Sequence, residues 1–406
     1  MPDLFWFRRD LRTFDNPALA AAGPQAVRVF VHDPHFANVG TPRARYLQDA
    51  LQPLDVVHLT GEPHVVLPAQ ATAHGARRVF CTGDATPYAT RRDAVVGEAL
   101  ARIGVELVAI DSPYAIPPGE VRNQAGDGFR VFTPFYKAWL ARGWAPPASD
   151  PVQTPALQRW RQFRDEGLAG YKQHRDQPAL DATSRLSAAL HFGQLHPRTI
   201  LAEIADPTTD PFARQLAWRE FCADVLWHRP QAAWASLDER FDTDMEYSAD
   251  QDHFLAWQQG RTGYPFVDAG MRQLLAEGWM HNRLRMVTAS FLIKDLHLPW
   301  QWGAAWFMKH LVDGDVANNQ LGWQWVAGCG TDAAPYFRIF NPVTQGKKFD
   351  PDGTFIRRYV PELADVPDPH EPGIFATDYP APIVDHSRER DVALARFQAL
   401  PPRAVR

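Results

Sequence analysis

Two carboxylates, two adjacent amides and two tryptophans lie within one short run, DGDVANNQLGWQW at residues 313–325. Carboxylates and amides supply hydrogen-bonding groups, and indole supplies a flat ring that is easily oxidised. The run fits neither an ordinary surface helix nor an amphipathic strand. Its ordinary interpretation is that Asp313 and Asp315 lie in a loop while Trp323 and Trp325 pack in a core. The other motifs of the chain must separate these alternatives.

A second candidate is TSRLS at residues 183–187, which opens the apolar segment LSAALHFG. Hydroxyl groups and free backbone N–H groups at the start of a helix, with Arg185 beside them, favour an anion such as a diphosphate. The alternative is an ordinary helix cap, because Ser and Thr are common in caps.

The segment QLAWREF at residues 215–221 has helical character, and Gln215, Trp218 and Cys222 recur at i, i+3 and i+7. This spacing places an amide and an indole on one helix face. An exposed indole beside a hydrogen-bonding group could stack a nucleobase. The alternative is a tryptophan that packs in the core.

The segment GWMHNRLRM at residues 278–286 places Asn282 and Met286 four residues apart, on one face of a helix. Arg283 and Arg285 could contact a phosphate or another anion. The alternative for both arginines is an ordinary solvated surface.

These motifs need elements that position them. In the first 117 residues, apolar runs at 3–7, 27–33, 56–61, 77–84 and 105–110 predict strands, and residues 42–54, 63–75 and 88–103 have helical periodicity. The alternation predicts a parallel five-stranded sheet with helices on both faces. No GxGxxG or GxxxxGK[ST] sequence occurs there, so neither a dinucleotide fingerprint nor a P-loop is expected.

A Pro- and Gly-rich stretch then separates this α/β domain (residues 1–117) from an all-α domain (154–406), so residues 118–153 are expected to form a connector. Helical patterns dominate the second half, for example at 212–227, 266–296 and 301–314. Ten of the fourteen tryptophans fall after residue 171, which is more than packing alone comfortably explains.

Composition excludes several classes of protein. The formal net charge of −5 argues against a protein that is positively charged over its whole surface, although a local basic patch remains compatible with it. No apolar run approaches the roughly 20 residues of a membrane helix, and the charged N-terminus does not resemble a signal peptide, so we expect a cytoplasmic protein. Cys81, Cys222 and Cys329 are scattered, so we expect neither a disulfide nor a metal site.

Several long motifs, in order and spacing, resemble the flavin domain of the DNA photolyase/cryptochrome family: TSRLS, WREF, TGYPFVDAGMRQL with GWMHNRLRM, and DGDVANNQLGWQW with GTDAAPYFRIFNPVTQGKKFD. FWFRRDLRTFDNPAL resembles the antenna-domain signature of that family. The resemblance covers nearly the whole chain and is strongest to class I cyclobutane pyrimidine dimer photolyases. It implies light-driven repair of such dimers by electron transfer from photoexcited reduced FAD to a dimer flipped out of the DNA.

The resemblance also implies which residues contact FAD. Asn319 matches the position that faces flavin N5, and Arg285 with Asp313 would hold a fixed ion pair beside a ring that carries negative charge. The full set matched to FAD is Tyr171, Thr183, Ser184, Arg185, Leu186, Ser187, Phe212, Arg285, Asp313, Gly314, Asp315 and Asn319.

For photoreduction of the flavin, Trp323 and Trp300 match the first two members of the family's electron-transfer chain. Tyr247 stands where the third, surface-proximal tryptophan is usual. Two endings of the relay are therefore open: Tyr247, which would lose a proton on oxidation, or another tryptophan such as Trp302 or Trp306.

On the substrate side, Trp218 matches the indole that stacks on the dimer, and Asn282 and Met286 occupy positions where (6-4) enzymes carry histidines. Gln215 replaces the usual glutamate, so the stabilisation of the dimer during repair is open. The set matched to DNA is Arg175, Gln215, Trp218, Arg219, Cys222, Asn282, Arg283 and Gln345, with Lys347 and Lys348 as further candidates.

The resemblance implies a second, light-harvesting chromophore in the α/β domain, either methenyltetrahydrofolate or an 8-hydroxy-deazaflavin, and Arg43, Arg45 and Tyr88 do not decide between them. The expected partner is UV-damaged DNA, with no protein partner and a monomeric state. A rival hypothesis is a cryptochrome-type blue-light photoreceptor with weak or no repair activity, which Gln215 and Tyr247 favour. Against it, no long disordered tail follows the matched domain. A dark flavin oxidoreductase is a more distant rival.

Overall fold

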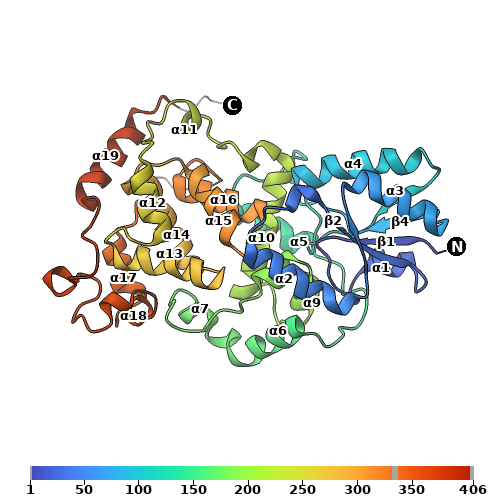
Figure 1. Ribbon diagram of the computed structural model, residues 1–406, viewed down its shortest axis with the longest axis horizontal. Coiled ribbons are helices and arrows are strands. Elements are labelled where there is room, and N and C mark those ends of the chain that lie inside the picture. The colour runs from blue at the N-terminus through green and yellow to red at the C-terminus, as the bar shows by residue number, and fades with distance from the viewer. Residues whose placement is uncertain (1, 332–336, 403–406) are drawn as a thin grey trace. The chain divides into compact units, whose positions relative to one another are not determined.

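A computed structural model describes residues 2–331 and 337–402 (Figure 1). The chain forms two compact units: unit 1 comprises Met1–Ala169 and Ser184–Pro230, and unit 2 comprises Gly170–Thr183 and Gln231–Arg406. The sequence-based boundaries at residues 117 and 153 follow composition rather than packing, so the division into antenna domain, connector and all-α domain stays a prediction.

Unit 1 contains the predicted parallel sheet, with strand order β3-β2-β1-β4-β5 (Figure 1). Leu4 of β1 lies opposite Val27 of β2 on one side and Val79 of β4 on the other. The five strands are β1 (Leu4–Phe7), β2 (Val27–His32), β3 (Val57–Thr60), β4 (Arg78–Cys81) and β5 (Glu106–Ala109). The prediction of a parallel α/β sheet is confirmed.

Both faces of the sheet are covered, because successive side chains of a strand point to opposite faces. Leu4 and Trp6 pack in one buried cluster with Leu67 and Val96 of helices α3 and α4. Phe5 and Phe7 pack in a second cluster with residues of α1 and α2. The helices of unit 1 are α1 (Pro17–Ala22), α2 (Thr41–Leu51), α3 (Pro63–His74), α4 (Pro87–Ala101), α5 (Phe132–Arg142), α6 (Pro155–Glu166), α8 (Ser187–His191), α9 (Pro197–Ala202) and α10 (Pro211–His228).

Helix α10 belongs to unit 1 because it packs along α5 and binds the segment that follows the sheet. The buried carboxyl group of Glu220 accepts hydrogen bonds from the backbone N–H groups of Ala115 (2.5 Å) and Ile116 (3.2 Å) and from Trp139 Nε1 (2.6 Å). Burial raises the pKa of Glu220 to about 7. The Pro-rich segment is thus anchored by buried polar contacts.

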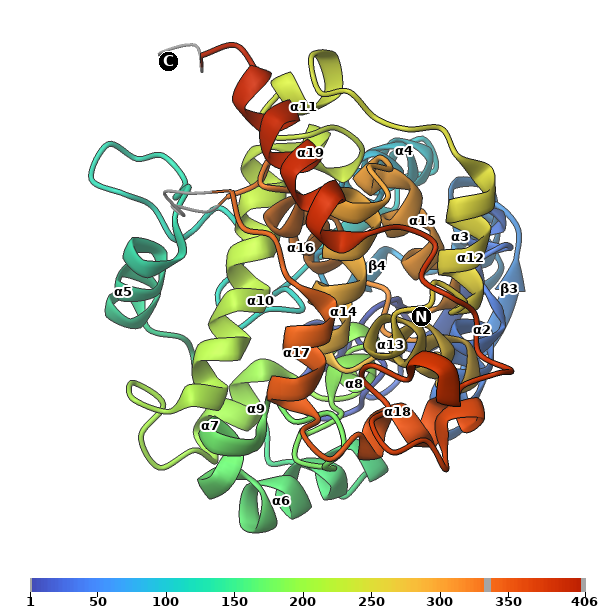
Figure 2. The same ribbon diagram turned by 90° about the vertical axis from the view of Figure 1, so that its left-hand side faces the viewer.

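The described residues of unit 2 contain helices and no strand, as predicted for this half. α13 packs against α14, α17 and α18, while α16 packs against α14 and α15 (Figure 2). The helices of unit 2 are α7 (Tyr171–His174), α11 (Arg240–Thr243), α12 (Gln251–Gln259), α13 (Pro265–Glu277), α14 (Asn282–Ser290), α15 (Trp300–His310), α16 (Val316–Ala327), α17 (Pro342–Phe349), α18 (Thr354–Tyr359) and α19 (His386–Ala399).

The helical stretch expected at 266–296 is interrupted. Gly278 ends α13 in the left-handed conformation (φ 64°, ψ 16°), where a side chain would be strained. α14 then begins at Asn282 and continues into a short π-helical segment, Phe291–Asp295. Because of this break, α14 starts as a separate helix with its own N-terminus.

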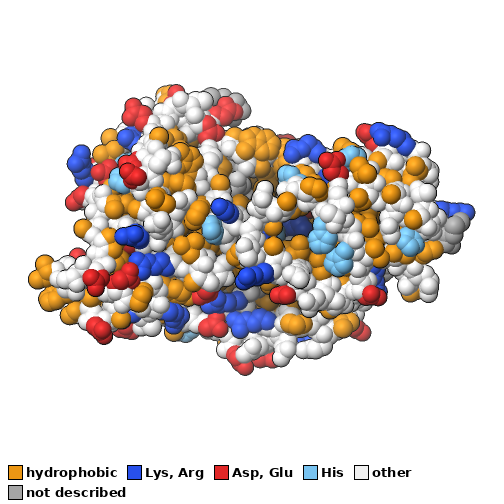
Figure 3. Space-filling model, viewed as in Figure 1, with side chains coloured by type: hydrophobic (Ala, Val, Ile, Leu, Met, Phe, Trp, Pro, Cys, Tyr) orange, Lys and Arg blue, Asp and Glu red, His pale blue; other side chains and the backbone are white. Residues whose placement is uncertain are grey.

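On the face shown in Figure 3, basic and acidic side chains are interspersed, in keeping with the small net charge of the chain. None of the helices in the described part of the chain combines the length and the apolar character that crossing a lipid bilayer requires.

Candidate functional site

The predicted site residues are divided between the two units. Unit 1 holds Ser184, Arg185, Leu186, Ser187, Phe212, Gln215, Trp218, Arg219 and Cys222. Unit 2 holds Tyr171, Arg175, Thr183, Tyr247, Asn282, Arg283, Arg285, Met286, Trp300, Asp313, Gly314, Asp315, Asn319, Trp323 and Gln345.

Two buried carboxylates, Asp313 and Asp315, precede α16 and accept hydrogen bonds from different partners. Asp313 Oδ2 accepts from Arg285 Nη2 at 2.8 Å, and Arg285 Nε also donates to the carbonyl of Met280 at 2.8 Å. Asp315 caps α16, because its Oδ1 accepts from the backbone N–H of Asn318 (3.0 Å) and from Asn318 Nδ2 (2.7 Å). The ion pair is held by α14 and by the residues before α16, so its position follows from the packing of α14 against α16.

Asn319 lies in the first turn of α16 and is partly exposed. Its Nδ2 donates to the carbonyl of Ala304 (3.1 Å) and to Gln320 Oε1 (2.8 Å), which leaves the amide oxygen as its remaining hydrogen-bonding atom. Gly322 follows three residues later on the same face, and a Cβ added there would meet no atom within 4 Å. This face of α16 therefore presents a hydrogen-bond acceptor beside open space.

The start of α14 carries the side chains predicted to meet substrate. His281 is buried and caps the helix through Nδ1, which accepts from the N–H of Arg283 at 3.2 Å. Burial lowers the pKa of His281 to about 4, so this imidazole is neutral at neutral pH. Asn282 is exposed, and its Nδ2 lies 3.7 Å from Met286 Sδ, so the predicted shared face of these two residues is confirmed.

Several basic residues predicted to face DNA already have partners in unit 2. Arg283 Nη2 lies 2.9 Å from Asp176 Oδ1, and its guanidinium sits 4.1 Å from the centre of the Phe349 ring. Arg175 lies over the ring of Tyr171, and Lys347 pairs with Glu371. The exposed Lys347–Glu371 pair contributes little energy, and Lys347 can exchange its partner for a phosphate.

The two remaining candidates of unit 2 lie on α17. Gln345 has a buried Oε1 without a hydrogen-bond partner among the described residues, and Lys348 is exposed. A DNA contact by either residue stays a prediction.

In unit 1, the TSRLS sequence forms the turn before α8. Ser184 is buried, its Oγ accepts from the N–H of Leu186 at 3.4 Å, and Arg159 Nε donates to its carbonyl at 3.0 Å. Arg185 has a left-handed backbone (φ 53°), a conformation that most residues avoid. α8 begins at Ser187, and no described side chain caps it. N–H groups at the start of a helix that lacks a side-chain cap can bind an anion.

Helix α10 presents the predicted base-stacking residue. Phe132 of α5 covers one face of Trp218, with ring centroids 3.7 Å apart and an interplanar angle of 8°. Gln215, one turn earlier, is partly exposed, and among the described residues its side chain makes a single long hydrogen bond, 3.5 Å, to the carbonyl of Pro211. The indole of Trp218 thus has at most one ring face open for stacking. The amide of Gln215, which can both donate and accept a hydrogen bond, lies on the adjacent turn.

The other predicted residues of α10 have internal contacts. Arg219 donates to the carbonyls of Pro113 (3.0 Å) and Leu190 (3.1 Å), so its guanidinium holds two backbone segments of unit 1 together. Phe212 is buried against Trp160, with ring centroids 5.5 Å apart. Cys222 is partly exposed. The structure gives Arg219 and Phe212 packing roles, and their ligand contacts stay predictions.

The two tryptophans predicted to start the electron relay lie in the core of unit 2. Trp323 of α16 packs against the backbone of α15 at Gly303, where an added Cβ would come within 2.1 Å of the indole ring. Trp300 starts α15, three residues before Gly303, and is fully buried. Its Nε1 donates to Ser236 Oγ at 2.9 Å. Both indoles thus lie at α15: Trp300 belongs to this helix, and Trp323 packs against it from α16.

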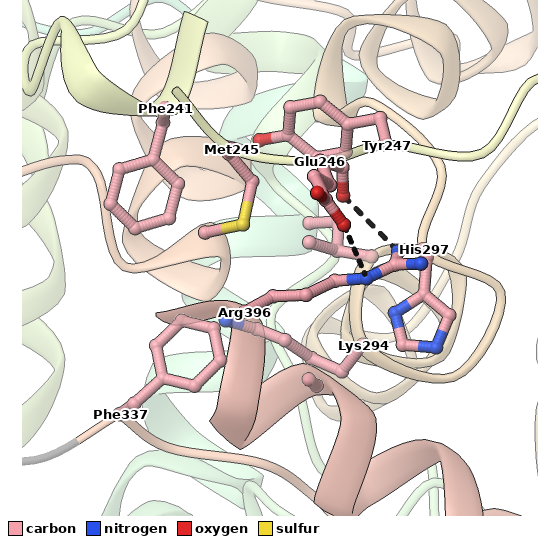
Figure 4. A pocket seen from close by; sticks show the side chains of 10 residues that line it. Phe241, Met245, Glu246, Tyr247, Lys294, His297, Phe337 and Arg396 are labelled. Atoms are coloured by element: carbon pink, nitrogen blue, oxygen red, sulfur yellow. Dashed lines mark hydrogen bonds and ion pairs between the residues drawn. The ribbon is translucent and has the colours of Figure 1, made fainter. Parts of the chain in front are cut away.

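Tyr247 lines a small cavity together with Phe241, Met245, Lys294 and Phe337, among others (Figure 4). The cavity has a volume of about 10 Å³, about the space of one water molecule. The hydroxyl of Tyr247 is buried and forms no hydrogen bond to a described residue. Burial raises its pKa above the ordinary value. Tyr247 therefore has no bonded proton acceptor among these residues.

Sequence reasoning missed residues that act through non-local contacts. Ser236 binds Trp300, Phe132 backs Trp218, and Asp176 pairs with Arg283. Gly303 did carry a usable signal, because an isolated glycine inside a helical pattern often marks close packing.

Comparison with known proteins gives matches to both halves of the chain. Residues 3–156 match the family model described as DNA photolyase, and residues 212–399 match the FAD binding domain of DNA photolyase. The chain is 39% identical to the deoxyribodipyrimidine photo-lyase of Halobacterium salinarum, over 97% of this chain and 98% of the relative. It is 38% identical to that of Escherichia coli, over 98% of each.

Solved structures are similar over the same length. A class III photolyase from Agrobacterium tumefaciens has a TM-score of 0.90 at 34% identity and covers 98% of this chain and 97% of its own. A cryptochrome from Synechocystis has a TM-score of 0.88 at 26% identity and covers 98% of each chain. An archaeal photolyase from Sulfolobus tokodaii, which contains two FAD molecules, has a TM-score of 0.85 at 28% identity and covers 98% of this chain and 100% of its own.

Proposed function

Because the chain belongs to the DNA photolyase family, we propose that it is a deoxyribodipyrimidine photo-lyase, which repairs cyclobutane pyrimidine dimers in DNA with light. The observation that carries the proposal is the identity of 38% and 39% to relatives of that name over nearly the full length of each chain. Class I stays a prediction, since a class III photolyase is among the similar structures. The cytoplasmic location and the monomeric state also stay predictions.

The residues present fit FAD. The open face of α16 at Asn319 and Gly322 accommodates the edge of a flat ring, and the Arg285–Asp313 pair stands at the start of the same helix. The uncapped start of α8 suits a diphosphate. When bound, FAD supplies the absorption of light and the electron that opens the dimer.

The protein groups would orient the cofactor and stabilise charge. Asn319, whose Nδ2 is held by Ala304 and Gln320, would accept a hydrogen bond through its amide oxygen. Arg285 would place a positive charge beside the ring, and Asp313 keeps that guanidinium in place. Because protein contacts already hold Asn319 and Arg285 in place, these side chains would need to move little during the reaction.

We assign the substrate contacts to residues of α10 and α14. Trp218 would stack on one base of the flipped dimer, while Gln215 and Asn282 would hydrogen-bond base edges and Met286 would supply apolar contact. A neutral amide at position 215 offers both a donor and an acceptor, so it can bind the dimer in its neutral and reduced forms. Phosphate contacts would come from Arg175, Arg283, Lys347 and Lys348, whereas Arg219 already donates to two backbone carbonyls.

Trp323 and Trp300 would deliver an electron when the cofactor is oxidised. Burial of both indoles removes them from water, and the close approach of Trp323 to Gly303 holds the first donor rigidly. The antenna chromophore belongs to the same proposal; the Sulfolobus tokodaii relative has a second cofactor. In unit 1, Tyr88 stacks on His35 at 3.8 Å and bonds Asp33, so this tyrosine has its own protein contacts.

The deciding experiment illuminates the FAD-loaded, chemically reduced protein with single-stranded DNA that contains one thymine dimer. We expect loss of the dimer in the light and none in the dark, with flavin absorption unchanged after repair. Intact dimers after many absorbed photons per protein would instead support the photoreceptor hypothesis. Rapid flavin reduction by NADH in the dark would support the oxidoreductase.

A further inference from the structure

A chain of hydrogen bonds leads away from the indole N–H of Trp300. Trp300 Nε1 donates to Ser236 Oγ at 2.9 Å, and Ser236 Oγ donates to Asp242 Oδ1 at 2.7 Å. The backbone N–H of Ser236 donates to the other carboxylate oxygen, also at 2.7 Å. The serine hydroxyl therefore accepts from the indole and donates to the carboxylate, which is the order that proton transfer requires.

The chain runs from the core of unit 2 to its surface. Trp300 has 0% and Ser236 has 3% of its surface exposed, whereas Asp242 of α11 is an exposed residue. Gln301 Nε2 donates to Asp242 Oδ1 at 3.1 Å. The indole N–H of Trp300 thus reaches a solvated carboxylate through one buried hydroxyl.

The loop that carries Ser236 is held by an amide of α16. Gln324 Nε2 donates to the carbonyls of Ala232 (2.9 Å) and Ala235 (3.2 Å), and Gln324 Oε1 accepts from the N–H of Leu237 at 2.9 Å. Gln324 is the neighbour of Trp323. The same helix therefore positions the first donor of the relay and the loop that receives the proton of the second.

We propose that Ser236 and Asp242 form the proton exit of Trp300, so that the relay ends on Trp300 as a neutral indole radical. This inference rests on the proposed photoreduction through Trp323. It differs from an ending on Tyr247, whose hydroxyl has no bonded acceptor among the described residues.

The step balances as follows. Bound oxidised FAD, when photoexcited, would supply the oxidising power: Trp323 would lose one electron to it, and oxidised Trp323 would take one electron from Trp300. The N–H bond of oxidised Trp300 breaks, its proton goes to Ser236 Oγ, and the hydroxyl proton of Ser236 goes to the carboxylate of Asp242. The flavin would keep the one electron, and the protein products would be a neutral Trp300 radical and a protonated Asp242. Loss of the proton removes the positive charge that would otherwise pull the electron back.

The test is time-resolved absorption after a light flash on protein with oxidised FAD, because protonated and deprotonated indole radicals have different spectra. Asp242→Asn is the primary variant, since the residue is exposed and its amide cannot accept the proton. Ser236→Ala interrupts the chain at its centre. Asp244→Asn is the matched control: it removes the same charge two residues away, where Asp244 Oδ2 accepts from Thr243 Oγ1.

We expect Asp242→Asn and Ser236→Ala to slow deprotonation of the indole radical by on the order of 10²-fold, the usual contribution of a positioned proton acceptor. Asp244→Asn should keep the parent rate, and the flavin spectrum of each variant reports its folding. Equal rates in all four proteins would overturn the proposal, as would a tyrosyl radical in the parent at the same delay. Absence of any indole radical in the parent would overturn it too, while dimer repair by reduced protein would show that the proposed function stands.

Discussion

The stacking of Phe132 on Trp218 limits how a base can bind to this indole. Because Phe132 covers one face of the indole, a base can stack on no more than the opposite face. The amide of Gln215 lies one turn away and makes only a 3.5 Å hydrogen bond, so it can turn toward a base edge. In the proposed site, stacking and hydrogen bonding thus fall to two different side chains of α10, Trp218 and Gln215.

Replacing Trp218 with alanine should weaken binding of dimer-containing DNA, because stacking contributes about 1–3 kcal/mol per base, or roughly 5- to 150-fold in Kd. Fluorescence anisotropy with labelled single-stranded DNA measures the change, and the flavin absorption checks the fold. Trp234→Ala, at an exposed tryptophan of unit 2, is the control and should bind normally. Equal affinity of Trp218→Ala and the parent would remove Trp218 from the substrate site.

At the scale of elements, α14, α15 and α16 form the frame of the proposed flavin site. α16 packs against both of the others, so the ion pair, the amide and the two indoles proposed as the relay have fixed relative positions within unit 2. The close approach at Gly303 and the buried cap at His281 are the two points where this frame is most sensitive to change.

Gly303→Ala should disturb the frame, since the new Cβ would come within 2.1 Å of the Trp323 ring. Overpacking of this kind costs about 1–3 kcal/mol in the free energy of unfolding, and displacement of Trp323 should slow photoreduction of FAD. Urea denaturation and the rate of flavin bleaching under blue light measure both effects. Gly97→Ala in α4 is the control, because its Cβ would have an ordinary contact at 3.9 Å. A Gly303→Ala protein as stable as the parent would contradict the packing argument.

His281 makes the cap of α14 sensitive to pH. Its pKa is lowered to about 4 in the folded protein, below the ordinary value near 6.5, because the charged form is disfavoured by burial. A lowered pKa means that the stabilising contribution is complete above pH ~6.5 and is lost as the pH falls toward 4. The full effect is about 3 kcal/mol by linkage.

We therefore expect the free energy of unfolding of the parent to fall more steeply between pH 6.5 and 4 than that of His281→Asn, which keeps a capping side chain but does not titrate in this range. Urea denaturation at several pH values gives the comparison. Parallel pH profiles for the two proteins would show that His281 titrates normally.

At the scale of the whole molecule, the residues assigned to FAD belong to both units: Ser184–Ser187 and Phe212 to unit 1, and the others to unit 2. A ligand that binds only the folded chain stabilises it by mass action, by about 2.7 kcal/mol at a free concentration of 100 times Kd. Removal of FAD should accordingly lower the melting temperature.

The measurement is thermal unfolding of the stripped protein with and without added FAD, together with its absorption spectrum. Added FAD should restore both the colour and the melting temperature. Riboflavin is the control and should restore less, because it lacks the diphosphate that the turn before α8 is proposed to bind. A polypeptide that stays colourless in excess FAD would contradict the flavin assignment.

The sequence by itself determined the local features of this protein. The short apolar runs specified the five parallel strands, since a strand buried on both faces needs nearly continuous apolar residues. Helical periodicity located α10 and α15, although it did not separate α13 from α14, and the spacing of Asn282 and Met286 correctly placed them on one face. Several long motifs in register sufficed to identify the family, because spacing between motifs reflects the whole fold.

Only the tertiary structure decided how those side chains are used. Arg219 and Arg283 look alike in sequence as basic helix residues, yet one bonds two carbonyls and the other pairs with Asp176. The link from Trp300 through Ser236 to Asp242 joins residues up to 64 positions apart. Such contacts depend on how distant segments pack, and residue type and local spacing carry no information about which distant partner a polar group meets.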